Sequence, residues 1–194
     1  MRLILRISLF LCATALFAQP GNWHIDPLHS SAQFSVRHMM ISTVRGHFGG
    51  VKGNVTLDAK NPAADKVEAT IDCTTINTGE PKRDSDLKGE EFFDVKKYPT
   101  MKFKSTSVEA AGVGKLKVTG DLTINAITRQ VVLDIDGPTP PVKDTQGRVK
   151  VGVLATTKVS RKEFGILYNP VMETGGVAVS DEVAIELDIE LIKN

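Results

Sequence analysis

Four histidines are the first residues to consider for chemistry, because imidazole binds metals and acts as a base near neutral pH. They are His24, His29, His38 and His47, and no helical His-x-x-x-His pair occurs among them. His38 shares an alternating face with the apolar residue Phe34, whereas the other three fall on different predicted elements or faces. We therefore expect His38 to point inward, and we expect no bound metal.

Acidic residues from position 84 imitate the start of a calcium-binding loop. Asp84 and Asp86 have the required spacing, but Lys88 and Val95 stand where the loop needs oxygen ligands, so we reject a calcium site. Arg83 has two interpretations. It could contact a phosphate-like head group, which suits a guanidinium, or form a local ion pair with Asp84 on an exposed helix.

No group of residues predicts catalysis, which requires a nucleophile, a base and an orienting group to converge. A Gly-x-Ser-x-Gly elbow is absent. His29, Ser30 and Ser31 are adjacent, but a strand would point neighbouring side chains to opposite faces. Cys73 has no basic neighbour in the sequence to lower its pKa, so we interpret it as core or cavity wall. We expect no catalytic residue and no cofactor.

The first eighteen residues have the features of a secretory signal. Arg2 and Arg6 precede an apolar run over 7–17, which is too short to span a bilayer, and Ala18 offers a small residue for cleavage. We therefore expect a signal peptide over 1–18, one domain over 19–194, and a periplasmic or secreted bacterial protein.

Charge and cysteine content exclude several classes of protein. Without Arg2 and Arg6, 22 basic residues face 23 acidic ones, and no basic stripe is present. We therefore expect no nucleic-acid partner. Cys73 is the only cysteine after the predicted signal, which excludes an internal disulfide and a zinc site of several cysteines.

Alternation of apolar and polar residues with a period of two is the dominant pattern, and it predicts strands with one buried face. Asn125-Ala126 predicts a tight hairpin, because asparagine tolerates a left-handed backbone. The alternating segments are 31–38, 43–57, 67–73, 100–109, 115–124, 128–136, 148–159 and 182–191.

One charged segment, residues 80–94, interrupts this pattern and is compatible with a helix near 81–92. Its apolar residues are Leu87, Phe92 and Phe93. Many short strands with one crossing helix favour an all-β fold, an eight-stranded antiparallel barrel with one short helix across an opening. A β-sandwich is the main structural alternative.

An eight-stranded barrel encloses room for side chains or for one small ligand. Small residues on the predicted inner face could leave volume unfilled, or could permit tight curvature, and both interpretations stay open. Those residues are Ala32, Gly46, Gly53, Ala69, Gly120 and Ala155.

Four blocks of the sequence carry a family resemblance. Residues 23–53 read aromatic-x-Ile-Asp-x-x-His-Ser and then Phe-x-Val-Arg-His, and residues 76–106 contain Thr-Gly-x-x-x-Arg-Asp and Phe-Phe-Asp. Residues 118–135 contain Gly-Asp-Leu-Thr-Ile, and residues 164–192 contain Phe-Gly and Gly-Gly-x-x-Val-x-Asp-Glu-Val. In this order the blocks resemble the YceI family of lipocalin-like, polyisoprenoid-binding proteins.

Two positions depart from the family pattern. Asp86 stands where the family often has histidine, which could alter contacts with a head group. Asn125-Ala126 replaces a commoner His-Gly turn.

The resemblance implies a lipocalin-like barrel whose apolar tunnel holds an isoprenoid or fatty-chain amphiphile. The head-group candidates at its mouth are Arg83, Asp86, Tyr168 and Asn169. The residues expected to contact the ligand are Phe34, Val36, His38, Phe48, Ile71, Leu87, Phe92, Phe93, Met101, Phe103, Leu122, Ile124, Phe164, Leu167 and Tyr168.

We therefore expect a non-catalytic protein that binds, sequesters or transports a long-chain lipid. Two alternatives stay open. One is a barrel enzyme of the cyclase or isomerase type acting on a bound lipid, which would need an acid–base pair beside the ligand. The other is a filled barrel that acts as a stress or interaction protein. A homodimer is a further partner that the sequence permits.

Overall fold

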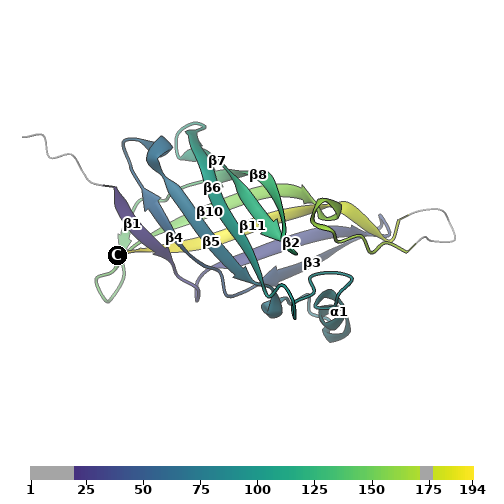
Figure 1. Cartoon of the computed structure of the whole chain (residues 1–194). Helices are drawn as coiled ribbons and strands as arrows, with labels where there is room; N and C mark the ends of the chain where they lie inside the picture. Colours follow the sequence, from purple (N-terminus) through teal and green to yellow (C-terminus); the bar gives the residue numbers. More distant parts are fainter. Residues whose placement is uncertain (1–19, 171–176) are drawn as a thin grey trace, which may run out of the picture.

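The computed structural model describes residues 20–170 and 177–194. The signal peptide expected over 1–18 lies outside the described residues. Within those two ranges, no helix is both long enough and apolar enough to cross a membrane. The strands form an elongated barrel, and a short helix, α1, lies at one end of it (Figure 1).

Eleven strands in the described part of the chain occupy eight positions around one closed antiparallel barrel. The barrel closes because β11 pairs with β10 on one side and with β1 and β2 on the other. The expected eight-stranded barrel is therefore confirmed, and the sandwich is wrong. The strands are β1 Gly21–Ile25, β2 Ser31–His38, β3 Ser42–Phe48, β4 Lys52–Leu57, β5 Lys66–Asp72, β6 Thr100–Ala110, β7 Lys115–Ile124, β8 Ile127–Asp136, β9 Val142–Lys143, β10 Val149–Ser160 and β11 Val179–Lys193.

Three of the eight positions are each built from two strands: β1 with β2, β3 with β4, and β8 with the short β9, which both pair with β10. β1 pairs with residues 191–193 of β11, and β2 pairs with residues 179–188. β3 and β4 follow one another beside β2 and β1, and residues 49–51 separate them. The strand expected over 43–57 is therefore interrupted. β1 was not expected, because its five residues show little alternation.

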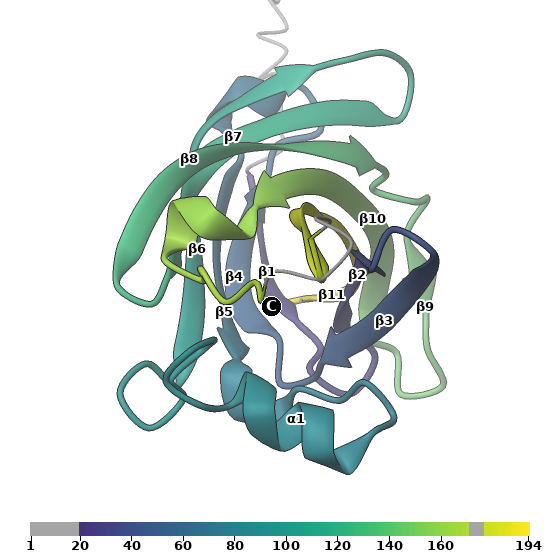
Figure 2. The same cartoon turned by 90° about the vertical axis from the view of Figure 1, so that its right-hand side faces the viewer.

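The segment between β5 and β6 lies along the edge of one opening of the barrel, with α1 as its helix, so the helix stands beside the opening and not across it as expected (Figure 2). The helix spans Pro81–Leu87, and the carboxylate of Glu80 caps it by accepting hydrogen bonds from the backbone amides of Lys82 at 3.2 Å and Arg83 at 2.7 Å. The expectation of a helix near 81–92 was therefore too long. The amide of Gly89 bonds to the carbonyl three residues earlier, and the chain continues as turns, so helical bonding stops there.

Three single-turn 3₁₀ helices complete the described elements: η1 Pro62–Ala64, η2 Cys73–Thr75 and η3 Arg161–Phe164. The third lies between β10 and the segment that leads to β11, at the same end of the barrel as α1 (Figure 2).

The tight hairpin expected at Asn125-Ala126 is confirmed. Asn125 and Ala126 have φ values of 50° and 60°, and Ile124 pairs directly with Ile127. Two consecutive positive φ values define the turn type whose twist matches that of the flanking strands. This turn fixes the register of β7 against β8.

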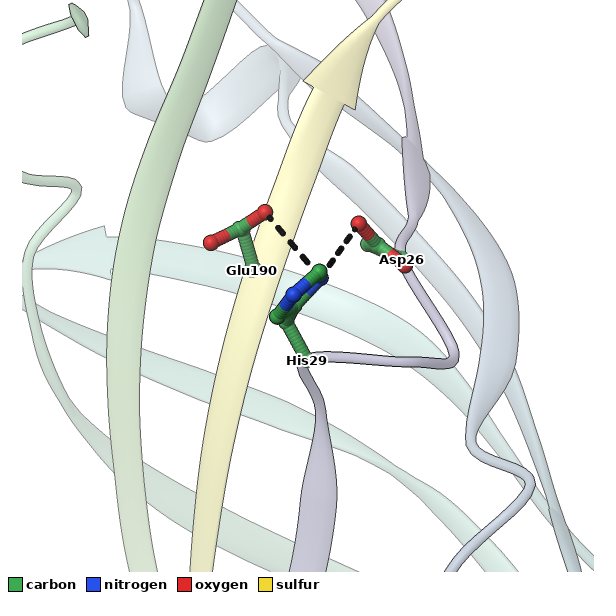
Figure 3. A group of neighbouring side chains, drawn as sticks. All are labelled: Asp26, His29 and Glu190. Carbon is green, nitrogen blue, oxygen red and sulfur yellow. Dashed lines mark hydrogen bonds and ion pairs between the residues drawn. The ribbon is translucent and has the colours of Figure 1, made fainter. Parts of the chain in front are cut away.

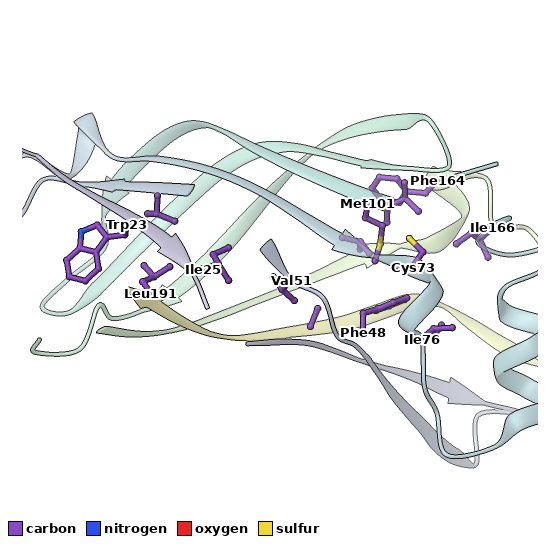
Figure 4. Close-up of a cluster of buried hydrophobic side chains, with 14 of the residues drawn as sticks. Trp23, Ile25, Phe48, Val51, Cys73, Ile76, Met101, Phe164, Ile166 and Leu191 are labelled. Carbon is purple, nitrogen blue, oxygen red and sulfur yellow. The ribbon is translucent and has the colours of Figure 1, made fainter. Parts of the chain in front are cut away.

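Buried apolar side chains run along the length of the barrel and form its core (Figure 4). Trp23 and Leu191 lie toward one end of the cluster, and Phe164 and Ile166 toward the other. The outward faces carry cross-strand ion pairs, such as Lys104–Glu68 at 2.7 Å and Lys117–Asp134 at 2.9 Å. This division of faces is the one that the alternation predicted.

Two glycines on the inner face make room for phenyl rings rather than leaving empty space. A Cβ at Gly46 would lie 2.5 Å from Cζ of Phe34, the residue paired with it on β2. A Cβ at Gly120 would collide with the ring of Phe103 and with the carbonyl of Lys104. The idea that every small inward residue leaves a void is therefore wrong at these two positions.

Candidate functional site

The barrel encloses an apolar cavity of about 940 Å³. Inward side chains from β2 through β11 line it, and the apolar face of β11 contributes Val183, Ile185, Leu187, Ile189 and Leu191. The alternation of β11 marks these five as inward, but they were not among the residues expected to contact the ligand. The volume falls within the range of pockets that hold drug-sized ligands.

Most residues expected to contact the ligand lie on the wall of this cavity. Arg83 and Asp86 line it too, from α1. The expected residues found on the wall are Phe34, Val36, His38, Phe48, Ile71, Leu87, Phe92, Phe93, Met101, Phe103, Leu122, Ile124, Phe164 and Tyr168.

Two expected site residues lie elsewhere. Leu167 is 64% exposed and is not among the lining residues, so its placement in the tunnel was wrong. Asn169 also does not line the cavity. Its side-chain carbonyl accepts hydrogen bonds from the amides of Ala178 at 3.0 Å and Val179 at 3.1 Å, and its Nδ2 donates to the carbonyl of Val179. Asn169 thus holds two chain segments together instead of facing a head group.

His38 stands on the rim of the cavity. It lines the cavity as parity with Phe34 predicted, but it ends β2 and its surface is exposed to solvent. His38 is therefore on the inward face of β2, as expected, but it lies at the rim of the cavity and not in its interior. At this position the imidazole can meet water and the polar end of a molecule at the same time.

A set of aromatic contacts connects the barrel wall to the segment that follows α1. The ring centroids of Phe34 and Phe48 lie 5.5 Å apart, and those of Phe48 and Phe93 lie 5.3 Å apart with nearly perpendicular rings. Phe92 contacts Tyr168 with centroids 5.0 Å apart. Aromatic pairs in these arrangements add stability beyond the area they bury. The segment that follows α1 is thus packed as part of the cavity wall.

Arg83 and Asp84 connect the start of α1 to Thr78. Nε of Arg83 donates to Oγ1 of Thr78 at 2.8 Å, and its Nη2 donates to the carbonyl of Thr78 at 3.0 Å. The carboxylate of Asp84 accepts from the hydroxyl and the amide of Thr78, and this lowers the pKa of Asp84. The simple Arg83–Asp84 ion pair is replaced by a shared anchor at Thr78.

Arg161 is a cavity residue that sequence reasoning missed. Its side chain is 6% exposed, and its guanidinium donates to the backbone carbonyls of Ser180, Ile166, Tyr168 and Val179 at 2.7–3.3 Å. Burial lowers the pKa of Arg161. Four backbone carbonyls thus hold this positive charge at the cavity wall, and the carboxylate of Asp181 lies 3.7 Å from Nη2.

A second polar group lies at the bend between β1 and β2, where Asp26, His29 and Glu190 each point a side chain toward the same place (Figure 3). Nδ1 of His29 is 2.9 Å from Asp26 Oδ2 and 3.8 Å from Glu190 Oε1. The hydrogen bond from His29 lowers the pKa of the Asp26 carboxyl to about 2.

These three residues could each offer one ligand atom to a metal ion. The ammonium of Lys150, however, already lies 2.6 Å from Glu190 Oε1 and 3.5 Å from Asp26 Oδ2. We interpret the group as an ion network that fixes the bend, because a cation from the chain itself balances both carboxylates.

Cys73 belongs to the core and does not line the cavity. It is 2% exposed, and burial raises the pKa of its thiol to about 11. Of the two interpretations left open for this residue, core is correct and cavity wall is wrong.

Comparison with known proteins places this barrel among related chains. A family model described as a YceI-like domain matches residues 23–191. A UPF0312 protein of Vibrio parahaemolyticus is 34% identical over 183 residues, which cover 93% of this chain and 92% of that protein.

Two solved structures have the same fold. BcnA of Burkholderia cenocepacia superimposes with a TM-score of 0.72 at 23% identity, over 86% of this chain and 98% of BcnA. A polyisoprenoid binding domain from Saccharophagus degradans superimposes with a TM-score of 0.61 at 13% identity, over 89% of this chain and 98% of that domain. Both likenesses are in the barrel itself.

Proposed function

The chain belongs to the YceI-like domain family, and from that premise we propose that it binds one long-chain apolar amphiphile, a polyisoprenoid or a fatty-chain lipid, inside the barrel without chemical conversion. The fold is shared with a domain described as polyisoprenoid binding. That likeness supports the lipid class and leaves the particular ligand to experiment.

The cavity is the observation that carries this proposal. A space of about 940 Å³ with a mostly apolar wall is costly to leave empty, because its lining loses contacts on one side. A long hydrocarbon chain would restore those contacts and leave water at the same time. The same space argues against the filled barrel that acts only as an interaction protein.

Desolvation of the chain would supply the affinity. Each buried CH₂ group contributes about 0.8 kcal/mol before the costs of ordering. A chain of about fifteen carbons would therefore offset typical association costs, which are estimated at about 4–15 kcal/mol. No polar contact along the chain is needed for this.

Polar groups at the mouth would select the head group. Arg83 and Asp86 line the cavity from α1, and His38, Tyr168 and Arg161 line it near the adjoining rim. A phosphate or carboxylate near Arg161 would meet a guanidinium that donates to backbone carbonyls and whose nearest carboxylate, that of Asp181, is 3.7 Å away. We infer a preference for an anionic or strongly polar head group.

The proposal includes export. The features of residues 1–18 suit a protein that works in the periplasm or outside the cell, where a carrier would shield an apolar chain from water. A homodimer stays a prediction for solution measurements.

The test is to identify what the protein carries. We would purify it under non-denaturing conditions from cells that produce it naturally, record native mass spectra, and extract and identify any lipid. A stoichiometric adduct with a long hydrocarbon chain is the expected result. Protein free of lipid, together with no binding of a fluorescent isoprenoid alcohol or fatty acid, would contradict the proposal.

A further inference from the structure

Exposed apolar side chains are concentrated at one end of the barrel. Among the described residues, eleven large apolar side chains are exposed, and six of them lie at the end that carries α1. We call these six the apolar collar. They are Met39, Met40, Ile41, Leu167, Tyr168 and Val177.

Hydrogen bonds bring the three segments of the collar together. The amide of Met39 donates to the carbonyl of Ala178 at 2.8 Å, which places the β2–β3 turn beside the start of β11. Asn169 bonds to Ala178 and Val179, as described above, and Arg161 donates to the carbonyls of both Tyr168 and Val179. The collar is therefore one surface made from parts of the chain that are distant in sequence.

The collar adjoins the mouth of the cavity. Three cavity-lining residues connect to it: Tyr168 is part of the collar, His38 precedes Met39, and Val179 pairs with His38. Seen from this end, the β2–β3 turn and η3 lie on opposite sides of the opening, with α1 on a third side (Figure 2). The exposed apolar surface is thus continuous with the apolar interior.

The β2–β3 turn is unfavourable in two ways: its backbone is left-handed, and its apolar side chains are exposed to water. Met39 and Met40 have φ values of 50° and 60°, a left-handed conformation that large side chains rarely adopt. They are 41% and 56% exposed, so packing within the chain does little to compensate. Arg37 fixes the turn, since its Nη2 donates to the carbonyl of Met40 at 2.8 Å and its Nη1 donates to Oγ1 of Thr43 at 2.9 Å. A conformation that is both strained and exposed points to a role outside the isolated chain.

We propose that the apolar collar docks on the surface of a lipid bilayer, so that an amphiphile passes between bilayer and cavity without crossing bulk water. This inference rests on the proposed function. A long-chain lipid that leaves a bilayer through water exposes its whole chain, and this exposure makes its release slow. A mouth whose rim lies among the head groups and upper acyl chains removes that step.

We infer that the collar contacts a bilayer, and not another protein, because it surrounds the opening of an apolar cavity. The collar is a rim of apolar side chains about an opening into an apolar cavity, and the molecules that fit that cavity are held in bilayers. Shallow insertion of a few large apolar side chains is how peripheral proteins bind at the boundary between head groups and acyl chains. Neighbouring charges of both signs, such as Lys162 and Asp181 paired at 2.7 Å, favour apolar contact over attraction by lipid charge.

The experiment compares matched aspartate substitutions at the two ends of the barrel. Ile41→Asp and Leu167→Asp place a charge in the collar, at residues 78% and 64% exposed. Val113→Asp is the control, because Val113 is fully exposed in the β6–β7 turn at the opposite end. Circular dichroism melting verifies that each variant folds. The probes are phosphatidylcholine vesicles and farnesol carrying a dansyl fluorophore.

Wild type and Val113→Asp should co-sediment with the vesicles, and their rate of transfer of dansyl-farnesol to vesicles should rise with vesicle concentration. Each collar variant should bind vesicles and transfer the probe roughly tenfold less well, the effect of keeping one large apolar side chain out of the bilayer. Equilibrium binding of dansyl-farnesol in the absence of vesicles should change by less than about twofold, because the substituted side chains do not line the cavity.

Three results would overturn the collar proposal while leaving the proposed function intact. One is wild-type protein that binds dansyl-farnesol but neither co-sediments nor shows a transfer rate that depends on vesicle concentration. Another is a collar whose substitution abolishes self-association in analytical ultracentrifugation without altering vesicle binding. The third is co-sedimentation of both collar variants equal to that of wild type. Failure of wild type to bind dansyl-farnesol while it still co-sediments would count against the proposed function instead.

Discussion

Nδ2 of Asn125 donates a hydrogen bond of 2.6 Å to the backbone carbonyl of Phe92. Asn125 lies in the β7–β8 turn, and Phe92 lies in the segment after α1 that forms part of the cavity wall. The turn residue therefore has two roles. It adopts the left-handed conformation that the hairpin needs, and it fastens the segment after α1 to the barrel.

Asn125→Asp should separate these roles. Aspartate tolerates the left-handed conformation, but a carboxylate cannot donate to the carbonyl of Phe92. We expect a loss of about 1–3 kcal/mol in the free energy of unfolding, measured with urea, and faster dissociation of a bound fluorescent lipid. Asn125→Gly is the control for the added charge, because glycine keeps the backbone conformation and removes the donor without introducing a carboxylate; it should therefore be destabilised as well. If Asn125→Asp matches wild type in both measurements, the Phe92 bond has no part in holding the segment after α1.

Gly46→Ala should narrow the cavity. The new Cβ would lie 2.5 Å from Cζ of Phe34 and 2.7 Å from Cγ2 of Thr78, so the phenyl ring must move, and the cavity is the space beside it. We expect long-chain lipid affinity to fall by about tenfold because the ring enters the cavity. The melting temperature of lipid-free protein should fall modestly, because the new Cβ also meets Thr78, which Arg83 and Asp84 hold in place. Isothermal titration with a long-chain fatty acid measures the affinity, and thermal unfolding of lipid-free protein measures the melting temperature.

Gly49→Ala is the matched control for that substitution, since a Cβ at Gly49 meets no atom within 4 Å. Gly49→Ala should leave both the lipid affinity and the melting temperature unchanged. A large drop in the melting temperature of Gly46→Ala, with unaltered affinity, would mean that Phe34 packs in a filled core.

Asp26→Asn should reduce the dependence of stability on acid. The pKa of the Asp26 carboxyl is lowered from 3.8 to about 2 in the folded protein. A lowered folded-state pKa means that the ionised form stabilises the fold, fully above about pH 4, and that this contribution is lost as the pH falls toward 2. The difference in unfolding free energy between wild type and Asp26→Asn should therefore shrink from pH 6 to pH 2.5.

Urea unfolding at the two pH values measures that difference, and Asp188→Asn, an exposed carboxylate on β11, serves as the control. A difference that grows on acidification would have the wrong sign for this ion network.

Cys73 should be unreactive in the folded protein. Burial raises the pKa of its thiol to about 11, so the thiolate fraction at pH 8 is on the order of one in a thousand, and the side chain is 2% exposed. We expect no reaction of this thiol with Ellman's reagent under native conditions and complete reaction in urea, with Cys12 replaced by serine wherever residues 1–18 are retained. Rapid native labelling would show that the β5–β6 connection opens readily.

Alternation in the sequence determined the barrel and much of the cavity wall. The apolar face of β11 and the pair Phe34 and Val36 could be assigned inward because a strand sends successive side chains to opposite faces. The Asn125-Ala126 turn was also predictable, since few residues accept a left-handed backbone. Strand faces and tight turns are set by residues that are close together in the chain, so the sequence alone is enough to predict them.

The irregular segments and the long-range partners could not be predicted in the same way. Leu167 and Asn169 lie outside any strand, so no period indicates which side they face. Nothing local shows that Arg161 will meet the carbonyls of Tyr168 and Val179, or that Lys150 will neutralise Asp26.

The size of the cavity and the position of its mouth were likewise decided by tertiary structure. Parity places Gly46 and Phe34 on one face, but only the register of β2 against β3 puts the ring over the glycine. The collar forms because Met39 pairs with Ala178, almost 140 residues away in the chain. A pattern in the sequence determines the face of a side chain, whereas distances across the barrel depend on strand pairing and closure, and these join residues that are far apart in the chain.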